Sequence, residues 1–201
     1  MSAALERMRA ALRPHHDRIE QAVNLMDPAI TRQHYVAFLA RTFGFIEPCE
    51  VALRAASGPR PFDLHERWKT TLLRENLAAV GMGAAAIAEL PRATDLPRLD
   101  SWPAALGYLY VIEGSTPGGQ VLLRGLVPRL SLSRSESVFL RSYERQVGEM
   151  WKTFLATLDT ALSASATDEL AIVATARATF VRLEAWHRGH RGPAALRRIA
   201  T

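Results

Sequence analysis

The chain has 201 residues, of which 48% are hydrophobic and 22% charged, the profile of an ordinary soluble globular protein with room for one domain. No apolar run approaches the roughly 18 residues of a membrane-spanning helix, and the N-terminus lacks the basic-then-apolar order of a secretory signal. A single cysteine, Cys49, rules out an intrachain disulfide, so we expect a protein of the cytoplasm with no membrane partner.

The formal net charge is +5, and much of the excess lies near the C-terminus. Basic residues suit an anionic partner, but aromatic side chains do not alternate with these arginines as a binder of single-stranded nucleic acid requires. We therefore expect a domain over residues 1–190, a basic solvated tail over residues 191–201, and no nucleic-acid partner.

Apolar residues recur at helical spacings between breaks rich in proline and glycine, and no sustained strand pattern is present. Pro14 interrupts the first expected helix, while Gly81 and Gly83 break the third. Loops are expected over 57–61 and 91–97, and a turn over 163–167 offers an N-cap to the last helix. The pattern predicts one all-α domain with helices over 3–23, 28 or 31 to 48–56, 63–90, 101–127, 135–162 and 167–188.

The most unusual segment lies within the fourth of these helices and reads GSTPGG over residues 114–119. Three glycines and a proline in six residues destabilise a helix, so either the helix ends there in a loop or the segment has a function. In the functional interpretation, the missing side chains let the backbone approach a flat ligand closely. A phosphate-binding loop fits less well, because no Lys-Ser/Thr pair follows and no strand precedes.

Two adjacent histidines, His15 and His16, lie on the first expected helix. A histidine on an amphipathic helix is more often a surface or core residue than a ligand, but haem iron accepts one neutral imidazole whose other nitrogen is held by an acceptor. Glu20 lies one turn after His16 on the same face and suits that role, directly or through water. His15 points about 100° away around the helix.

Together these segments resemble the bacterial haem oxygenases. In residues 9–20, Arg9 precedes His16 by seven positions and Glu20 follows by four, as at the start of that family. Residues 108–120, YLYVIEGSTPGGQ, resemble its distal-helix motif, most closely in the branch associated with bacterial phytochromes. GEMWKTF over 148–154 and ATF over 178–180 fall where the family has two later helices that line the haem pocket.

The resemblance implies a single-domain haem oxygenase-like fold, with haem between the proximal first helix and a kinked distal helix. It implies that His16 ligates the iron with Glu20 in support, and that four residues form the distal wall over the oxygen site: Gly114, Ser115, Gly118 and Gly119. It also implies that Arg9 and Lys152 meet the haem propionates and that Phe180 packs against the porphyrin.

Haem is both substrate and cofactor in this family, so the resemblance implies that dioxygen and external electrons open haem to biliverdin, CO and Fe²⁺. The electrons are expected from a ferredoxin or a reductase, because the chain has no flavin or nicotinamide fingerprint, and a bacteriophytochrome pathway is a candidate consumer of the product. One alternative is a haem carrier or sensor without turnover, favoured by Pro117, which removes an amide donor from the motif. Another is a helical interaction module that binds no haem.

Overall fold

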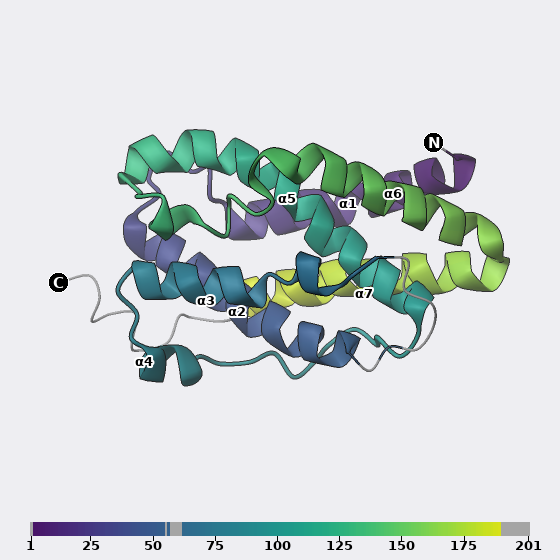
Figure 1. Cartoon of the computed structure of the whole chain (residues 1–201), viewed down its shortest axis with the longest axis horizontal. Helices are drawn as coiled ribbons and strands as arrows, with labels where there is room; N and C mark the ends of the chain where they lie inside the picture. Colours follow the sequence, from purple (N-terminus) through teal and green to yellow (C-terminus); the bar gives the residue numbers. More distant parts are fainter. Residues whose placement is uncertain (1, 55, 57–61, 190–201) are drawn as a thin grey trace.

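The computed structural model describes residues 2–54, 56 and 62–189, and within these ranges it contains helices and no β-strand. The predicted all-α class is therefore confirmed. The helices form an elongated bundle, with the later half of α5 and α6 along one long edge and α2, α3 and α4 along the other, while the first half of α5 crosses between the two edges (Figure 1). Their bounds are α1 Ala3–Val23, α2 Arg32–Leu53, α3 Thr70–Ala79, α4 Ala84–Ala88, α5 Trp102–Leu130, α6 Val147–Ala164 and α7 Ala166–Gly189, with 3₁₀ turns η1 His65–Arg67, η2 Ser135–Ser137 and η3 Glu144–Gln146.

None of the helices in the described part of the chain is long and apolar enough to cross a membrane. The expected loop over 57–61 and the expected tail over 191–201 lie outside the described residues.

Side-chain caps set where several helices begin. The Ser2 hydroxyl accepts from the backbone N–H of Leu5, and the Thr31 hydroxyl accepts from that of His34. Each bond satisfies an N–H that has no partner within the helix. The Thr31 cap decides between the two expected starts of α2, which begins at Arg32. The N-cap expected in the turn 163–167 is Ser165, whose hydroxyl accepts from the backbone N–H of Asp168 at 3.0 Å.

Prolines lie inside three of the long helices without ending them. The helix α1 continues through Pro14, so the expected interruption there is wrong. In α2, Pro48 has no N–H to donate to the carbonyl of Gly44, four residues earlier, and the backbone N–H of Ala93 donates to that carbonyl at 2.9 Å instead. This bond ties the connector before α5 to α2, at a glycine where a Cβ would lie 2.3 Å from the carbonyl oxygen of Pro91.

Two expected helices are shorter than the sequence suggested. In the segment 63–90, the α-helix begins only at Thr70, after the 3₁₀ turn η1. The expected break near Gly81 separates α3 from α4. In the segment 135–162, α6 begins at Val147. Tyr143 and Glu144 have φ values of 62° and 47°, a left-handed conformation that ends a right-handed helix, so the residues before α6 form turns instead.

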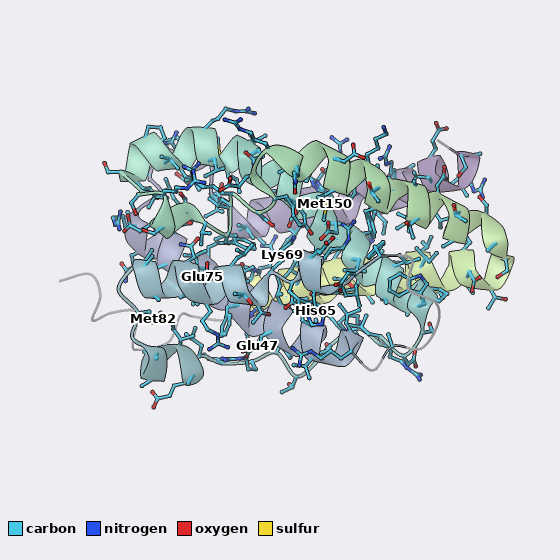
Figure 2. All side chains as sticks on the ribbon, viewed as in Figure 1. Glu47, His65, Lys69, Glu75, Met82 and Met150 are labelled. Carbon is cyan, nitrogen blue, oxygen red and sulfur yellow. The ribbon has the colours of Figure 1, made fainter. Side chains whose placement is uncertain are left out.

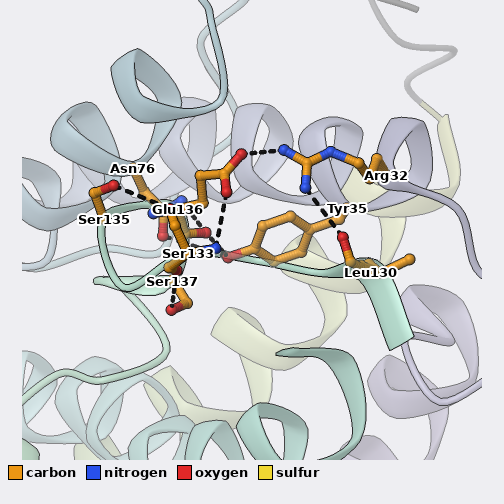
Figure 3. Close-up of polar contacts among 8 residues, drawn as sticks. All are labelled: Arg32, Tyr35, Asn76, Leu130, Ser133, Ser135, Glu136 and Ser137. Carbon is orange, nitrogen blue, oxygen red and sulfur yellow. Dashed lines mark hydrogen bonds and ion pairs between the residues drawn. The ribbon is translucent and has the colours of Figure 1, made fainter. Parts of the chain in front are cut away.

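The connector between α5 and α6 is anchored to α2 and α3 through one backbone carbonyl (Figure 3). The carbonyl of Glu136 accepts from the Tyr35 hydroxyl at 2.9 Å and from the side-chain amide of Asn76 at 2.7 Å. The guanidinium of Arg32 donates to the carbonyl of Leu130, at the end of α5, at 3.0 Å. These bonds fix where the chain turns back from α5 towards α6.

The pairs that position the candidate site are α1 with α7 and α5 with α7. The ion pairs Arg7–Glu169 and Arg18–Glu184 show that α1 and α7 run in the same direction. At Gly107, α5 approaches α7 so closely that a Cβ would lie 2.3 Å from the carbonyl oxygen of Ile172. Both α1 and α5 also pack closely on α6, whereas α1 and α5 make much less contact with each other.

Candidate functional site

The helices α1 and α5 run in the same direction and are bridged at two levels. At the first level, the Arg9 guanidinium bonds the Tyr110 hydroxyl and partly offsets the rise in the pKa of Tyr110 that burial causes. At the second, Met26, in the connector just after α1, covers Gly125 with its side chain, and a Cβ at Gly125 would lie 3.1 Å from the Met26 methyl carbon. Residues 10–25 and 111–124 lie between these levels, so His16 and the glycine segment lie at the same level along the two helices.

His16 is exposed in this region, with 49% of its side chain accessible. Its Nε2 lies 3.7 Å from a carboxylate oxygen of Glu20, and its Nδ1 lies 3.7 Å from one of Asp17. One ligand atom from each of the three residues lies within 4.8 Å of the others, an arrangement that could hold a metal ion. The structure thus brings His16 and Glu20 together as expected, and it adds Asp17, which the i, i+4 argument did not consider.

The neighbouring histidine is engaged elsewhere. His15 is half-buried, and its Nδ1 is hydrogen-bonded by the guanidinium of Arg18, which also forms an ion pair with Glu184 of α7. Burial lowers the pKa of His15, and the charges of Arg18 and Arg177 lower it further. His15 is therefore part of the contact between α1 and α7, and His16 is the histidine that remains accessible.

Phe180 of α7 lies beside His16. It is 5% exposed, and its ring is 6.3 Å from the imidazole, centroid to centroid, in an edge-on arrangement. The two residues come from helices that contact each other along their length, and the packing of Phe180 against a porphyrin stays a prediction.

The glycine segment does not end α5, so the interpretation as a loop is wrong. The helix runs unbroken to Leu130 and changes direction along its length (Figure 1). Two features explain the bend: the Ser115 hydroxyl donates to the carbonyl of Ile112 at 2.6 Å, and Pro117 has no N–H for the carbonyl of Glu113. Packing against α7 and α6 holds together a helix that local propensity alone would not sustain.

The glycines of this segment have different surroundings. Gly118 is exposed, and among the described residues no atom lies within 4 Å of the position that its Cβ would take. At Gly114 a Cβ would lie 3.5 Å from the indole of Trp151, and at the buried Gly119 it would lie 3.0 Å from the carbonyl oxygen of Leu140. Ser115 is exposed, three residues before Gly118. The open face of α5 is therefore made by Ser115 and Gly118, with Gly114 at its aromatic border and Gly119 packed on the turn before α6.

Aromatic side chains of α5 and α6 form that border. Trp151 lies 6.0 Å from Tyr110 and stacks on Phe154 at 5.6 Å, centroid to centroid. Sequence reasoning did not select Tyr110 or Trp151 as site residues, although both lie within the segments that carry the resemblance. Lys152, next to Trp151, is exposed on α6, and Arg9 is half-exposed beside Tyr110.

Over the described residues the chain is an all-helical bundle with an accessible imidazole on α1 and an exposed, glycine-containing face on α5. The comparisons with known proteins identify the family: the chain belongs to the haem oxygenases, since the family model described as "Heme oxygenase" matches residues 2–188. It is also similar to Heme oxygenase PigA of Pseudomonas aeruginosa, with 29% identity over 148 residues, which are 72% of this chain and 71% of that protein.

Proposed function

We propose that this protein is a haem oxygenase that opens haem to biliverdin, CO and Fe²⁺, with dioxygen and electrons from a separate donor. The observation that carries the proposal is the accessible imidazole of His16 on α1, at the same level as the open face at Gly118 on α5, in a chain of the haem oxygenase family. Haem serves as both substrate and cofactor in this proposal.

The residues on the α1 side fit an iron porphyrin. A neutral imidazole is an axial ligand that haem iron accepts, and the exposed ring of His16 meets that need. Glu20 and Asp17 each have a carboxylate oxygen 3.7 Å from a ring nitrogen, and either would accept the proton of the nitrogen that does not meet the iron. That bond would fix the tautomer and the orientation of the imidazole. Phe180 approaches the imidazole edge-on and adds apolar surface to this side of the site.

The residues on the α5 side fit a face that must leave room for dioxygen. Bound haem supplies the iron that activates dioxygen and the ring carbon that is oxidised. Gly118 leaves space above that face because it has no side chain, and the indole of Trp151 beside Gly114 excludes water from one edge. The Ser115 hydroxyl, held by its bond to the carbonyl of Ile112, is a polar group that can position an ordered water.

Two cations suit the haem carboxylates. Arg9 on α1 bonds Tyr110, and the exposed Lys152 follows Trp151 on α6. Charge-assisted hydrogen bonds from them anchor the propionates of an otherwise apolar ligand. Tyr110 contacts Trp151 through its ring and Arg9 through its hydroxyl, so it helps to orient the guanidinium.

The electron donor in this proposal is a ferredoxin or a reductase, and the net positive charge of the chain favours an acidic one. The proposed compartment is the cytoplasm, where such donors and haem are both present. A bacteriophytochrome pathway is the proposed consumer of the bilin.

The test is an absorption titration of the purified protein with haemin, followed by reductant in air and with catalase present. The proposal predicts a saturable shift of the Soret band, which then bleaches as a biliverdin band grows. Haemin that gives no saturable shift would contradict the proposal.

A second candidate function is a haem carrier or sensor without turnover. Pro117 favours it, because it removes one backbone N–H donor from the helix that faces the ligand. A carrier would show the same saturable Soret shift, but its haem would survive reduction in air.

A further inference from the structure

The carboxylate of Glu113 is buried at the start of the glycine segment, with a side chain 1% exposed. It accepts from Arg67 at 2.6 Å through one oxygen and from the Tyr143 hydroxyl at 2.7 Å through the other. The ammonium of Lys69 lies 3.4 Å from that second oxygen, and both cations have side chains 2% exposed. Lys69 also donates to Ser142 at 3.1 Å. We call Arg67, Lys69, Glu113 and Tyr143 the Glu113 cluster.

The Glu113 cluster joins three parts of the chain that are far apart in sequence. Arg67 and Lys69 precede α3, Glu113 belongs to α5, and Tyr143 lies in the turn before α6. The labelled side chains of Lys69 and Met150 lie near the middle of the molecule (Figure 2). Apolar side chains of similar volume would often stabilise a core as well as these buried charges do. What the charged side chains add is a set of directional bonds that fix α5 relative to its neighbours.

The segment of α5 beside the cluster needs such support from outside. Pro117 donates no bond to the carbonyl of Glu113, so the backbone ladder is weakened where the helix bends. The turn before α6 contacts α5 on both sides of Pro117. Tyr143 reaches Glu113 on one side, and Leu140 packs against Gly119 on the other, where a Cβ would lie 3.0 Å from its carbonyl oxygen.

That turn holds an unfavourable backbone conformation. Tyr143 and Glu144 are consecutive residues with positive φ, at 62° and 47°, a region that side chains larger than glycine rarely adopt. Such strain persists only where several surrounding contacts hold the backbone in that conformation, and strained residues are concentrated near functional sites. The bond from Tyr143 to Glu113 and the ring of Tyr143 beneath the Lys69 ammonium, 3.7 Å away, are contacts of that kind.

We propose that Glu113 is a positioning residue for the distal side of the site. Through the Pro117-containing segment of α5, it sets the distance of Ser115 and Gly118 from the haem face and their rotation about the helix axis. These two quantities decide which meso carbon of haem is oxidised. This inference rests on the proposed function. Glu113 itself does not touch haem; it acts through the backbone that follows it.

The experiment compares Glu113→Gln and Tyr143→Phe with the wild type. The first keeps the shape and removes the charge, and the second removes only the hydroxyl. Arg134→Ala is the matched control, because Arg134 pairs with Glu144 in the same connector through side chains that are 71% and 62% exposed. The readouts are amide hydrogen exchange of residues 113–120 in haem-free protein, the pH midpoint at which the absorption of the ferric complex changes, and the biliverdin isomer ratio.

We expect amide exchange in residues 114–119 to be about 10-fold to 100-fold faster in both variants, the factor for loss of a hydrogen bond to a buried charge. We also expect a shifted pH midpoint in the ferric complex and a mixture of isomers where the wild type forms one predominant isomer. Haem affinity stays near the wild-type value, since His16, Arg9 and Lys152 are intact. The Arg134→Ala control matches the wild type in every readout.

Unchanged exchange in both variants would overturn the inference. Faster exchange with an unchanged pH midpoint and isomer ratio would overturn it too, because the cluster would then be only structural. If Glu113→Gln does not fold, Tyr143→Phe, which keeps both cations, carries the same comparison. A wild type that binds haem without turnover would refute the proposed function alone, since exchange and the pH midpoint still decide the role of Glu113.

Discussion

Replacement of Gly118 by alanine is expected to make the haem-free protein more stable and to weaken the binding of haem or of CO to the ferrous complex. No described atom lies within 4 Å of the added Cβ, so the methyl group costs no packing strain. Alanine in a helix interior is favoured over glycine by about 0.5–1 kcal/mol. For a chain of this size the gain corresponds to a rise in melting temperature of about 1–4 °C.

The same methyl group stands on the open face of α5 that we assign to the ligand. Intrusion of a methyl group into filled space costs about 1–3 kcal/mol, which corresponds to roughly 5-fold to 150-fold weaker binding. The loss should appear in the affinity for haem or in the affinity of the ferrous complex for CO.

Two other glycines of α5 give the contrast that this reasoning requires. Gly107→Ala should destabilise the protein, because its Cβ would lie 2.3 Å from a backbone oxygen of α7. Gly119→Ala, with its Cβ 3.0 Å from the carbonyl oxygen of Leu140, should fall between Gly107→Ala and Gly118→Ala. Thermal unfolding and haemin titration of the three variants measure both effects. A Gly118→Ala protein that is less stable, or that binds haem and CO as the wild type does, would refute the reasoning.

Three further predictions concern α1 and the Glu113 cluster. His16→Ala should lose the axial-ligand absorption bands of the haem complex and its turnover, while His15→Ala should keep both; equal loss in the two variants would contradict the assignment. Glu113→Ala should destabilise the protein by about 3–5 kcal/mol, because it leaves two buried cations without their carboxylate; urea unfolding measures this, and a loss within the noise would refute the account of the cluster. The pKa of His15 is lowered in the folded state, chiefly by burial. Below the ordinary histidine pKa of 6.5 the unfolded chain therefore binds the proton more readily, and stability falls as pH falls through that range. His15→Gln should flatten this part of the pH–stability curve, and an unchanged slope would count against the proposed environment of His15.

Much of the fold follows from local signals in the sequence. Apolar spacing predicts the long helices, and the hydroxyl caps Ser2, Thr31 and Ser165 mark three of their starts. Local signals fail in the turn before α6, where Phe139, Tyr143 and Val147 have helical spacing. The left-handed backbone at Tyr143 is stabilised by a bond to Glu113, 30 residues away in sequence, and no local pattern contains that information.

The glycine segment shows the opposite failure. Its composition argues for a loop on intrinsic propensity, but α5 continues because its two halves pack on α6, α7 and the connector before α6. The proximity of His16 and Glu20 on α1 could be predicted, since the two residues are one helical turn apart and the contact is local. The Glu113 cluster could not be predicted, because Arg67 and Lys69, which pair with Glu113, come from the segment before α3. A single acidic residue within an apolar run is the one signal that could have indicated it.

The central claim, that this chain opens haem between α1 and α5, is tested most directly by counting the CO released per haem consumed. The haem complex is reduced in air with catalase present, and CO is trapped by ferrous myoglobin while the bilin is extracted and identified. The account predicts one CO and one biliverdin for each haem lost from the wild type, and neither product from His16→Ala. Haem that persists, or that is lost without CO and biliverdin, would contradict it.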